Sequence, residues 1–124
     1  MNEEDRSSIL SILLRACTAE DANHRLECAF NLPAIVHCLG VNQFVHTNMS
    51  ETIKLLSEDT DDNVRQKVAL GFAEICRILG SASHQFLGDT FTRLLVDGSQ
   101  KVSLSMFSKM AEVLQIWSVR GKVN

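Results

Sequence analysis

The sequence predicts an all-α protein folded as an α-solenoid, a right-handed superhelical stack of about three helical hairpins with six helices. Apolar residues recur at steps of 4, 4, 3 and 4, a spacing that places them on one face of an α-helix. This stripe occurs three times, shifted by 40 and then by 38 residues, and its first two copies both end in Leu-Gly. A period near 40 residues is typical of solenoids built from paired helices. The three stripes are His24, Cys28, Leu32, Ile35 and Leu39; Val64, Val68, Phe72, Ile75 and Leu79; and Val102, Met106, Met110, Val113 and Trp117.

We predict a single domain over residues 1–124, with repeats at approximately 4–40, 41–80 and 81–121. The hydrophobic content of 45% is ordinary for a folded chain. Both outer hairpins carry apolar residues on both helices, and neither end has the polar terminal repeat that isolated solenoids need. The sequence therefore predicts either a fragment of a longer array or a chain that self-associates end to end.

Charge and hydropathy limit the classes of partner. The net charge of −3 provides no basic surface for neutralising phosphates, so we expect no binding to nucleic acid. The apolar stretches are shorter than a membrane span, and the acidic N-terminus lacks the features of a targeting peptide. We expect a cytoplasmic or nuclear protein with no membrane partner.

In the first unit we expect a helix over 4–17, a turn over 18–23 and a second helix over 24–39. The apolar face of the first helix is formed by Ile9, Leu10, Leu13 and Leu14. Pro33 lies inside the second helix, where a missing N–H bends a helix at a cost of about 3 kcal/mol unless a neighbour compensates. This bend either curves the array for a partner or is a kink with no partner attached.

In the second unit we expect a helix over 42–57, capped by Asn42. Its inward positions are Phe44, Val45, Met49, Ile53 and Leu56. An acidic turn follows, and either Asp61 or Asp62 is expected to cap the next helix, because a short carboxylate reaches the unpaired N–H groups of the first turn. Gly80 is expected to end that helix, since glycine readily adopts the left-handed conformation.

In the third unit, residues 81–83 open a helix, and Gly98 and Ser99 turn the chain into a last helix over 99–118. The apolar positions of the first of these helices are Phe86, Leu87, Phe91, Leu94 and Leu95. We expect Gly121 to end the last helix and residues 122–124 to fray. Met106, Met110 and Trp117 fit either a ligand box or core packing, and their helical spacing favours the core.

No pattern of chemistry-bearing residues predicts catalysis. The four cysteines lack C-x-x-C spacing, and phosphate-binding glycine loops and hydrolase motifs are absent. His24 and Cys28 stand at i and i+4 and could face one metal ion, but their register favours packing. We expect no metal, no cofactor, no enzymatic activity and, in a reducing compartment, no disulfide.

The segment from Asp59 to Arg65 matches the D-x-x-x-x-V-R core of a HEAT repeat, and the apolar helix and Leu-Gly follow it. The chain therefore resembles HEAT-repeat proteins over essentially its whole length. Unit one has Ala19 in place of the aspartate and unit three has Ser103 in place of the arginine, which predicts that a continuous Asp–Arg ladder is interrupted.

A second run, over residues 27–36 and ending in Leu39-Gly40, resembles HEAT repeats in regulatory subunits of protein phosphatase 4. Those proteins are relatives of the protein phosphatase 2A scaffold. The resemblance implies that the turns within the repeats hold the catalytic subunit of a serine/threonine phosphatase.

The exposed positions of the turns and second helices are the candidate partner-binding residues, because stacked hairpins align their turns along one ridge. They are Glu20, Asp21, Glu58, Asp59, Asp61, Asp62, Gln66 and Lys67. Acidic residues at helix N-termini are also favourable without any partner, so capping is the alternative explanation for the aspartates.

The sequence favours a non-enzymatic protein-binding scaffold or regulatory subunit, most concretely of a phosphatase of the 2A/4 type. The alternative is a generic HEAT adaptor or a self-associating architectural module without a phosphatase link.

Overall fold

A computed structural model describes residues 3–123, apart from the side chains of residues 3, 6, 7, 9, 14 and 119–123. Within this range the chain forms seven α-helices and no β-strand, which confirms the predicted all-α solenoid class. The helices are α1 (Glu3–Cys17), α2 (Ala22–Phe30), α3 (Leu32–Val45), α4 (Met49–Ser57), α5 (Asp62–Leu79), α6 (Ala82–Leu95) and α7 (Gln100–Val123).

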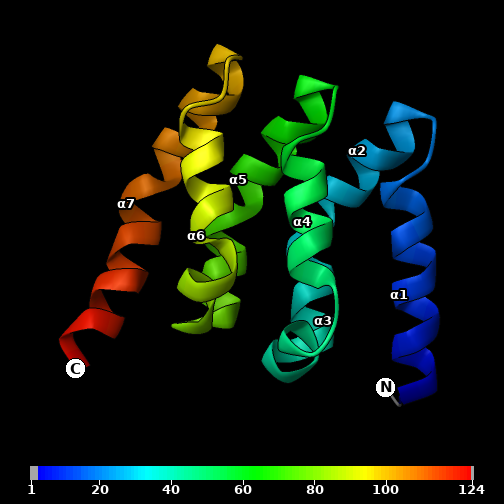
Figure 1. Ribbon diagram of the computed structural model, residues 1–124, viewed down its shortest axis with the longest axis horizontal. Helices are drawn as coiled ribbons and strands as arrows, with labels where there is room; N and C mark the ends of the chain where they lie inside the picture. The colour runs from blue at the N-terminus through cyan, green and yellow to red at the C-terminus, as the bar shows by residue number, and fades with distance from the viewer. Residues whose placement is uncertain (1–2, 124) are drawn as a thin grey trace.

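The helices form two layers, with α1, α4 and α6 in one row and α2, α3, α5 and α7 in the other (Figure 1). Helix α5 packs against α2 and α3 on one side and against α7 on the other, and α4 contacts both α1 and α6. The turns at 18–21, 58–61 and 96–99 all lie at the upper edge in Figure 1. Each unit therefore presents its turn on the same edge of the molecule, and we call this edge the turn ridge.

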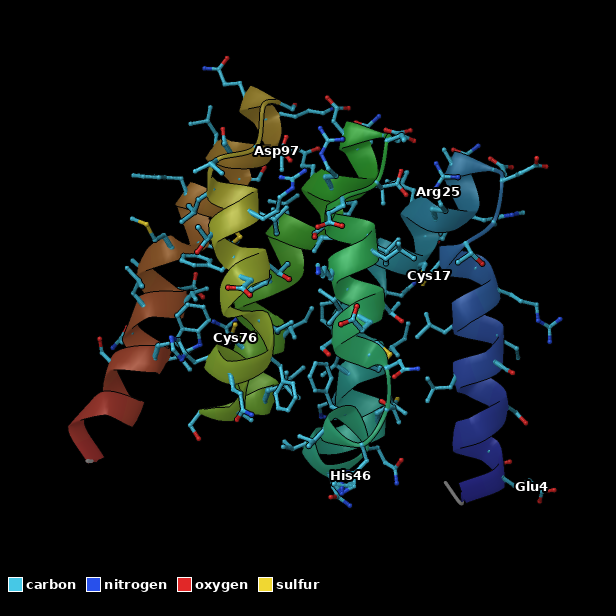
Figure 2. All side chains as sticks on the ribbon, viewed as in Figure 1. Glu4, Cys17, Arg25, His46, Cys76 and Asp97 are labelled. Carbon is cyan, nitrogen blue, oxygen red and sulfur yellow. A yellow bond between two sulfur atoms is a disulfide. The ribbon has the colours of Figure 1, made fainter. Side chains whose placement is uncertain are left out.

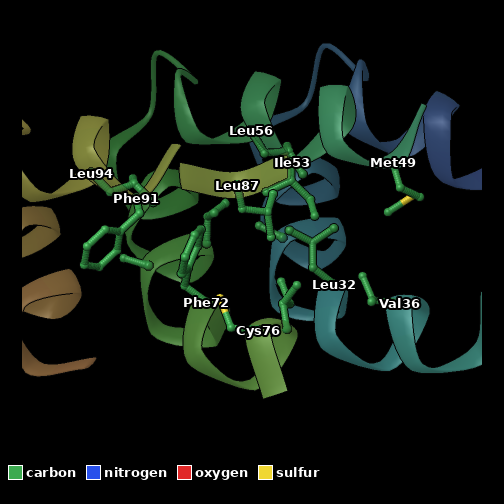
Figure 3. Close-up of a cluster of buried hydrophobic side chains, with 14 of the residues drawn as sticks. Leu32, Val36, Met49, Ile53, Leu56, Phe72, Cys76, Leu87, Phe91 and Leu94 are labelled. Carbon is green, nitrogen blue, oxygen red and sulfur yellow. The ribbon is translucent and has the colours of Figure 1, made fainter. Parts of the chain in front are cut away.

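The core runs between the two layers (Figure 3). Every position of the predicted middle stripe, from Val64 to Leu79, is buried. The rings of Phe72 and Phe91 stack with centroids 5.8 Å apart, and Phe44 meets Phe86 edge-on. Because burying one large apolar side chain stabilises a fold by about 1.5–3 kcal/mol, these shared positions hold adjacent units together.

A break near Pro33 divides the second helix of the first unit. The sequence predicted one bent helix over 24–39, but α2 ends at Phe30 and α3 begins at Leu32, with axes 55° apart. Pro33 thus lies in the first turn of α3, where its missing N–H would have no partner in any helix. The bend is confirmed, and because Asn31 takes up the break, Pro33 removes no hydrogen bond from the interior of a helix. No described helix is long and apolar enough on its own to cross a membrane, and only the bent pair α2–α3 reaches those limits together.

The predicted helix over 42–57 is wrong at its start. Gly40 has φ 79° and ψ 167° and redirects the chain, which continues as a short helical end of α3 to Val45. Helix α4 then begins only at Met49, so Asn42 is not its cap. Val45, expected to face inward, is 37% exposed, because the redirected segment buries Phe44 instead.

The third unit matches its predicted elements up to its end. Trp117 is half-buried, donates its Nε1–H to Ser83 Oγ at 2.9 Å and meets the Phe91 ring edge-on, which confirms core packing over a ligand box. Helix α7 continues through Gly121 to Val123, so the predicted stop is wrong. A glycine in a helix costs only about 1 kcal/mol, and it ends a helix only where it takes a positive φ. The predicted roles of Ile9 and Leu14 and the fraying of Asn124 lie outside the described residues.

Candidate protein-binding surface

Aspartates fix the first two turns of the turn ridge. Asp21 and Asp61 precede α2 and α5 in extended conformation, and their side chains accept hydrogen bonds from the N–H groups of Asn23 and Asn63 at 2.9 and 2.8 Å. Such a bond satisfies a donor that has no partner within the helix. Of the two predicted candidates, Asp61 is therefore the cap of α5.

An arginine joins the first unit to the second. The Arg25 guanidinium donates to both carboxylate oxygens of Asp59, at 2.7 Å from Nε and 3.2 Å from Nη2. Its Nη1 also donates to the carbonyls of Ala19 and Glu20 in its own turn. Asp59 accepts a further bond from the N–H of Asp61. A planar guanidinium fork matches a carboxylate in two places, so this pair fixes the relative orientation of the two turns.

The same arrangement joins the second unit to the third, through Asp97 at the upper edge of the molecule in Figure 2. Arg65 donates from Nε and Nη2 to Asp97 at 2.9 and 3.1 Å, and from Nη1 to the carbonyl of Asp59. The carboxylate of Asp97 also accepts from Arg93 at 2.6 Å and from the N–H of Ser99. An Arg–Asp ladder thus crosses both unit boundaries.

The prediction of an interrupted ladder is wrong for a geometric reason. Each arginine pairs with the aspartate of the following unit. The first unit therefore needs only its arginine and the third unit only its aspartate, and both are present. Ala19 and Ser103 occupy the two outermost positions of the series and leave the internal pairs, Arg25–Asp59 and Arg65–Asp97, intact.

The ladder carboxylate of Asp97 stays charged at neutral pH. Burial works to raise the pKa of Asp97, but the hydrogen bonds from Arg65, Ser99 and Arg93 outweigh it and lower the pKa to about 2. Hydrogen bonds from Lys101 and Ser99 lower the pKa of Asp62 as well. The hydrogen bond to Asp59 raises the pKa of Arg25. These groups stabilise the stack and are not poised to exchange protons.

The predicted partner-binding residues fall into two groups. Glu20 and Glu58 are exposed, and among the described residues no side-chain hydrogen bond or ion pair holds either carboxylate. The remaining acidic candidates act structurally: Asp21 and Asp61 are caps, Asp62 binds Ser99 and Lys101, and Asp59 has a side chain only 8% exposed. The structure thus leaves two of the six acids free to meet a partner.

Beside the ladder lies a polar hollow of about 580 Å³. It is lined by Ala22, Arg25, Thr60, Asp61, Asp62 and Arg65. Both signs of charge are present, and Arg25, Arg65 and Asp62 already have ion-pair partners, so the hollow has no strong net charge.

The second-helix candidates contribute differently. Gln66 donates to Ser105 at 3.3 Å between α5 and α7, so it belongs to the packing of the units. Lys67 places its ammonium 5.7 Å from the centre of the Phe30 ring, a cation–π distance. Lys67 is a predicted partner-binding residue, whereas the aromatic ring beneath it was not predicted.

Phe30 and Leu70 form an exposed apolar patch with Lys67. Phe30 is 65% exposed, and Leu70 is also exposed on the neighbouring helix. A groove of about 230 Å³ runs between them over Pro33 and Gly71, where a Cβ atom on Gly71 would lie only 3.0 Å from the proline ring. The sequence signal was present, because positions 30 and 70 are 40 residues apart and both are apolar residues outside the buried stripe.

The cysteines differ from the prediction in one respect. Cys17 at the end of α1 and Cys28 in α2 form a disulfide, with Cα atoms 5.9 Å apart. The expectation of no disulfide is wrong because it depended on the compartment, whereas the turn after α1 brings these two positions together. The bond also engages Cys28 and so removes the proposed His24–Cys28 ligand pair. In the described part of the chain, no three histidine, cysteine or acidic side chains gather as a metal site.

Comparison with known proteins found two similar sequences. The chain is 30% identical over 98 residues to mouse (Mus musculus) serine/threonine-protein phosphatase 4 regulatory subunit 4, and 29% identical over 98 residues to the human (Homo sapiens) protein of that name. The matched region is 79% of this chain but spans only 11% of each relative. No family model matches the chain. No solved structure matches it either.

Proposed function

We propose that this chain is a HEAT-type segment of a non-enzymatic scaffold or regulatory subunit that holds a serine/threonine phosphatase of the 2A/4 type. The observation that carries the proposal is the similarity, over 79% of the chain, to proteins named as regulatory subunits of phosphatase 4. The matched region is a small part of those proteins, so the proposal concerns a segment and not a whole subunit.

The internal ladder supports the HEAT assignment. Its two rungs relate consecutive units at nearly the same spacing as the apolar stripes, since Arg25 and Arg65 stand 40 residues apart and Asp59 and Asp97 stand 38 apart. A repeated polar contact and a repeated apolar stripe with one period define a structural repeat. The proposed units are 4–40, 41–80 and 81–121.

The proposed mechanism is positioning. The carboxylates that hold the turns also fix the backbone of the turn ridge, so a partner meets a surface that needs little ordering on binding. Glu20 and Glu58 supply unpaired negative charge at the ridge, and charged groups at the rim of an interface mainly accelerate association. Phe30, with Lys67 and Leu70, supplies an apolar anchor of the kind that dominates binding energy.

A phosphatase held in this way would act on substrates brought to it by the scaffold, and this chain would contribute no chemistry of its own. We place this activity in the cytoplasm or nucleus. The alternative is a generic adaptor or self-associating module, which the exposed apolar residues on the first and last helices favour.

The test measures binding of the purified chain to the purified catalytic subunit of phosphatase 4 by biolayer interferometry at two salt concentrations. We expect the double variant Glu20→Lys/Glu58→Lys to lower the association rate, most strongly at low salt. Phe30→Ala is expected to weaken binding by about 10-fold or more through faster dissociation. The control double variant Glu51→Lys/Asp89→Lys makes the same charge change on exposed residues of α4 and α6, away from the ridge, and should bind like the native chain.

Aspartates of the ridge are unsuitable for this test, because reversing Asp59 or Asp61 removes a ladder contact or a cap and destabilises the fold. A native chain that does not bind the catalytic subunit would reject the phosphatase proposal. Binding that is equal in all variants would reject the proposed surface.

A further inference from the structure

The last helix carries an uncovered apolar face. Leu104 and Phe107 are 58% and 61% exposed, and Ala111 and Leu114 are exposed as well. Their steps of 3, 4 and 3 place all four on one side of α7. We call this set the α7 outer face. Four neighbouring apolar positions on one helix face form a surface that fits a second helix.

This face occupies the positions by which α5 receives α7. Subtracting 38 from the α7 outer face gives Gln66, Ala69, Ala73 and Cys76 on α5. Gln66 hydrogen-bonds Ser105 of α7, and the other three residues are buried where α5 packs against its neighbours. The exposed residues of α7 are therefore equivalent to residues by which α5 packs against its neighbours, including α7.

The opposite end of the molecule carries the complementary surface. An apolar groove of about 490 Å³ lies between α1 and the α2–α3 segment, and its lining includes Ile12, Ala16, Glu27, Cys28 and Ile35. We call it the α1–α2 groove. Adding 78, the sum of the two repeat shifts, carries its last three residues onto α7.

Those three α7 positions are Ser105, Met106 and Val113. Ser105 is the partner of Gln66, and the other two are buried on the inner side of α7. The α1–α2 groove therefore includes the position by which α7 meets the unit before it, together with two positions that are buried in the third unit. One molecule thus displays both halves of its own internal interface, one at each end.

The two ends also match at the position of the Arg–Asp ladder. The internal boundary pairs Arg65 with Asp97, and the corresponding junction between two molecules would bring Ser103 to Ala19. Both members of this charged pair are absent at once, so the ladder position leaves no ion without a partner at the junction. A single loss would have left an uncompensated charge, which is strongly unfavourable at an interface.

We propose that this chain associates head to tail with a second copy of itself, seating the α7 outer face of one molecule in the α1–α2 groove of the next. The interface is heterologous and continues the internal stacking, so it propagates to further copies instead of closing as a two-fold dimer. This inference does not depend on phosphatase binding, since neither the turn ridge nor Phe30 takes part.

The experiment is sedimentation velocity of the full chain over a concentration series, with two blocking variants. Phe107→Asp places a charge on the α7 outer face, and Ile12→Asp places one in the α1–α2 groove. We expect the native chain to form a growing series of oligomers, and each variant alone to associate at least about 10-fold more weakly. The control Leu55→Asp alters an exposed apolar residue of α4, outside both ends, and should associate like the native chain.

Mixing the two blocking variants gives the sharpest outcome. Each retains one intact face, so a 1:1 mixture should form a dimer and nothing larger. Circular dichroism melts confirm that the variants are folded. A native chain that stays monomeric throughout, a mixture without dimers, or an Ile12→Asp variant that still dimerises alone would overturn the proposal. Loss of association in the Leu55→Asp control would overturn it too.

Discussion

Replacing Asp97 by Asn tests how the units are held together. The substitution keeps the size of the side chain but removes the charge that receives Arg65, Arg93 and the N–H of Ser99. The Asp97 side chain is only 1% exposed, so water cannot take its place. Arg65 would remain half-buried without its counter-ion, keeping its bond to the carbonyl of Asp59 and only a neutral amide oxygen in place of the carboxylate.

Two independent arguments give the size of the effect. Removing one partner of a buried charge pair costs about 3–5 kcal/mol, and the remaining exposure of Arg65 puts this pair near or below the lower end. The pKa of about 2, against an ordinary 3.8, corresponds to roughly 2 kcal/mol, because each pKa unit represents about 1.4 kcal/mol. We expect Asp97→Asn to lower the free energy of unfolding by about 2–3 kcal/mol.

The dependence on pH has a definite sign. Folding lowers the pKa of Asp97, so its stabilising effect is complete above the ordinary value of 3.8 and is lost as the pH falls toward 2. The gap in stability between the native chain and Asp97→Asn should therefore shrink with acid. Between pH 6 and pH 3 we expect it to decrease by about 1 kcal/mol.

Urea unfolding followed by circular dichroism measures both quantities. A double-mutant cycle with Arg65→Met isolates the pair, and we expect a coupling free energy of about 1–2 kcal/mol. Asp89→Asn, an exposed carboxylate of α6, is the matched control and should change stability by less than about 0.5 kcal/mol. An effect of Asp97→Asn no larger than this control, or a gap that is unchanged at pH 3, would refute the reasoning.

Three further predictions concern a turn, the core and the free thiols. Gly80→Ala should lower the free energy of unfolding in urea by about 1–3 kcal/mol, because Gly80 has φ 64° and ψ −139°. The control Gly88→Ala, in open space on α6, should raise it by up to about 1 kcal/mol, and equal responses would contradict the prediction. Phe72→Ala should cost about 3–5 kcal/mol in the same assay because it empties the centre of the core, and a cost below about 1 kcal/mol would contradict its burial. A thiol reagent followed by mass spectrometry should label exposed Cys38 in the folded chain but Cys76 only after unfolding, because burial raises the pKa of Cys76 to about 11. Early labelling of Cys76 would contradict it.

The fold class was predictable because the solenoid repeats its signal. The stripe of the middle unit is buried at every position, as its spacing indicated. Asp61 caps the start of α5 and Gly80 ends it, as predicted. Periodicity reports the face of a helix that must be buried, and three copies in register make a chance match improbable.

The break at Asn31 and the late start of α4 were not predictable by the same means. Both depend on where the chain must turn to pack against the next unit, and Gly40 permits that turn without specifying its direction. Pro33 indicated a bend, but the close approach of its ring to Gly71 is a tertiary feature that no local pattern indicates. Local patterns identify a breaker, whereas tertiary packing decides which residue absorbs the break.

The candidate surface was predictable in location but not in the roles of its residues. The sequence placed six acids on the turn ridge, and it could not separate those that hold the fold from those that are free, because the ladder pairs residues more than 30 positions apart. The disulfide between Cys17 and Cys28 was missed for a related reason, since it depends on the turn that brings two helices together.

This division of roles makes the proposed binding surface separable from stability. Asp59 and Asp97 cannot change without weakening the ladder, so their variants alter partner binding and folding together. Glu20, Glu58 and Phe30 are exposed and make few contacts that hold the fold, so changes there are expected to leave the free energy of unfolding within about 0.5 kcal/mol. A partner that uses the ridge must therefore respond to the second group in variants whose stability is unchanged. A partner that responds only to ladder variants would be responding to the relative orientation of the units and not to a surface they present.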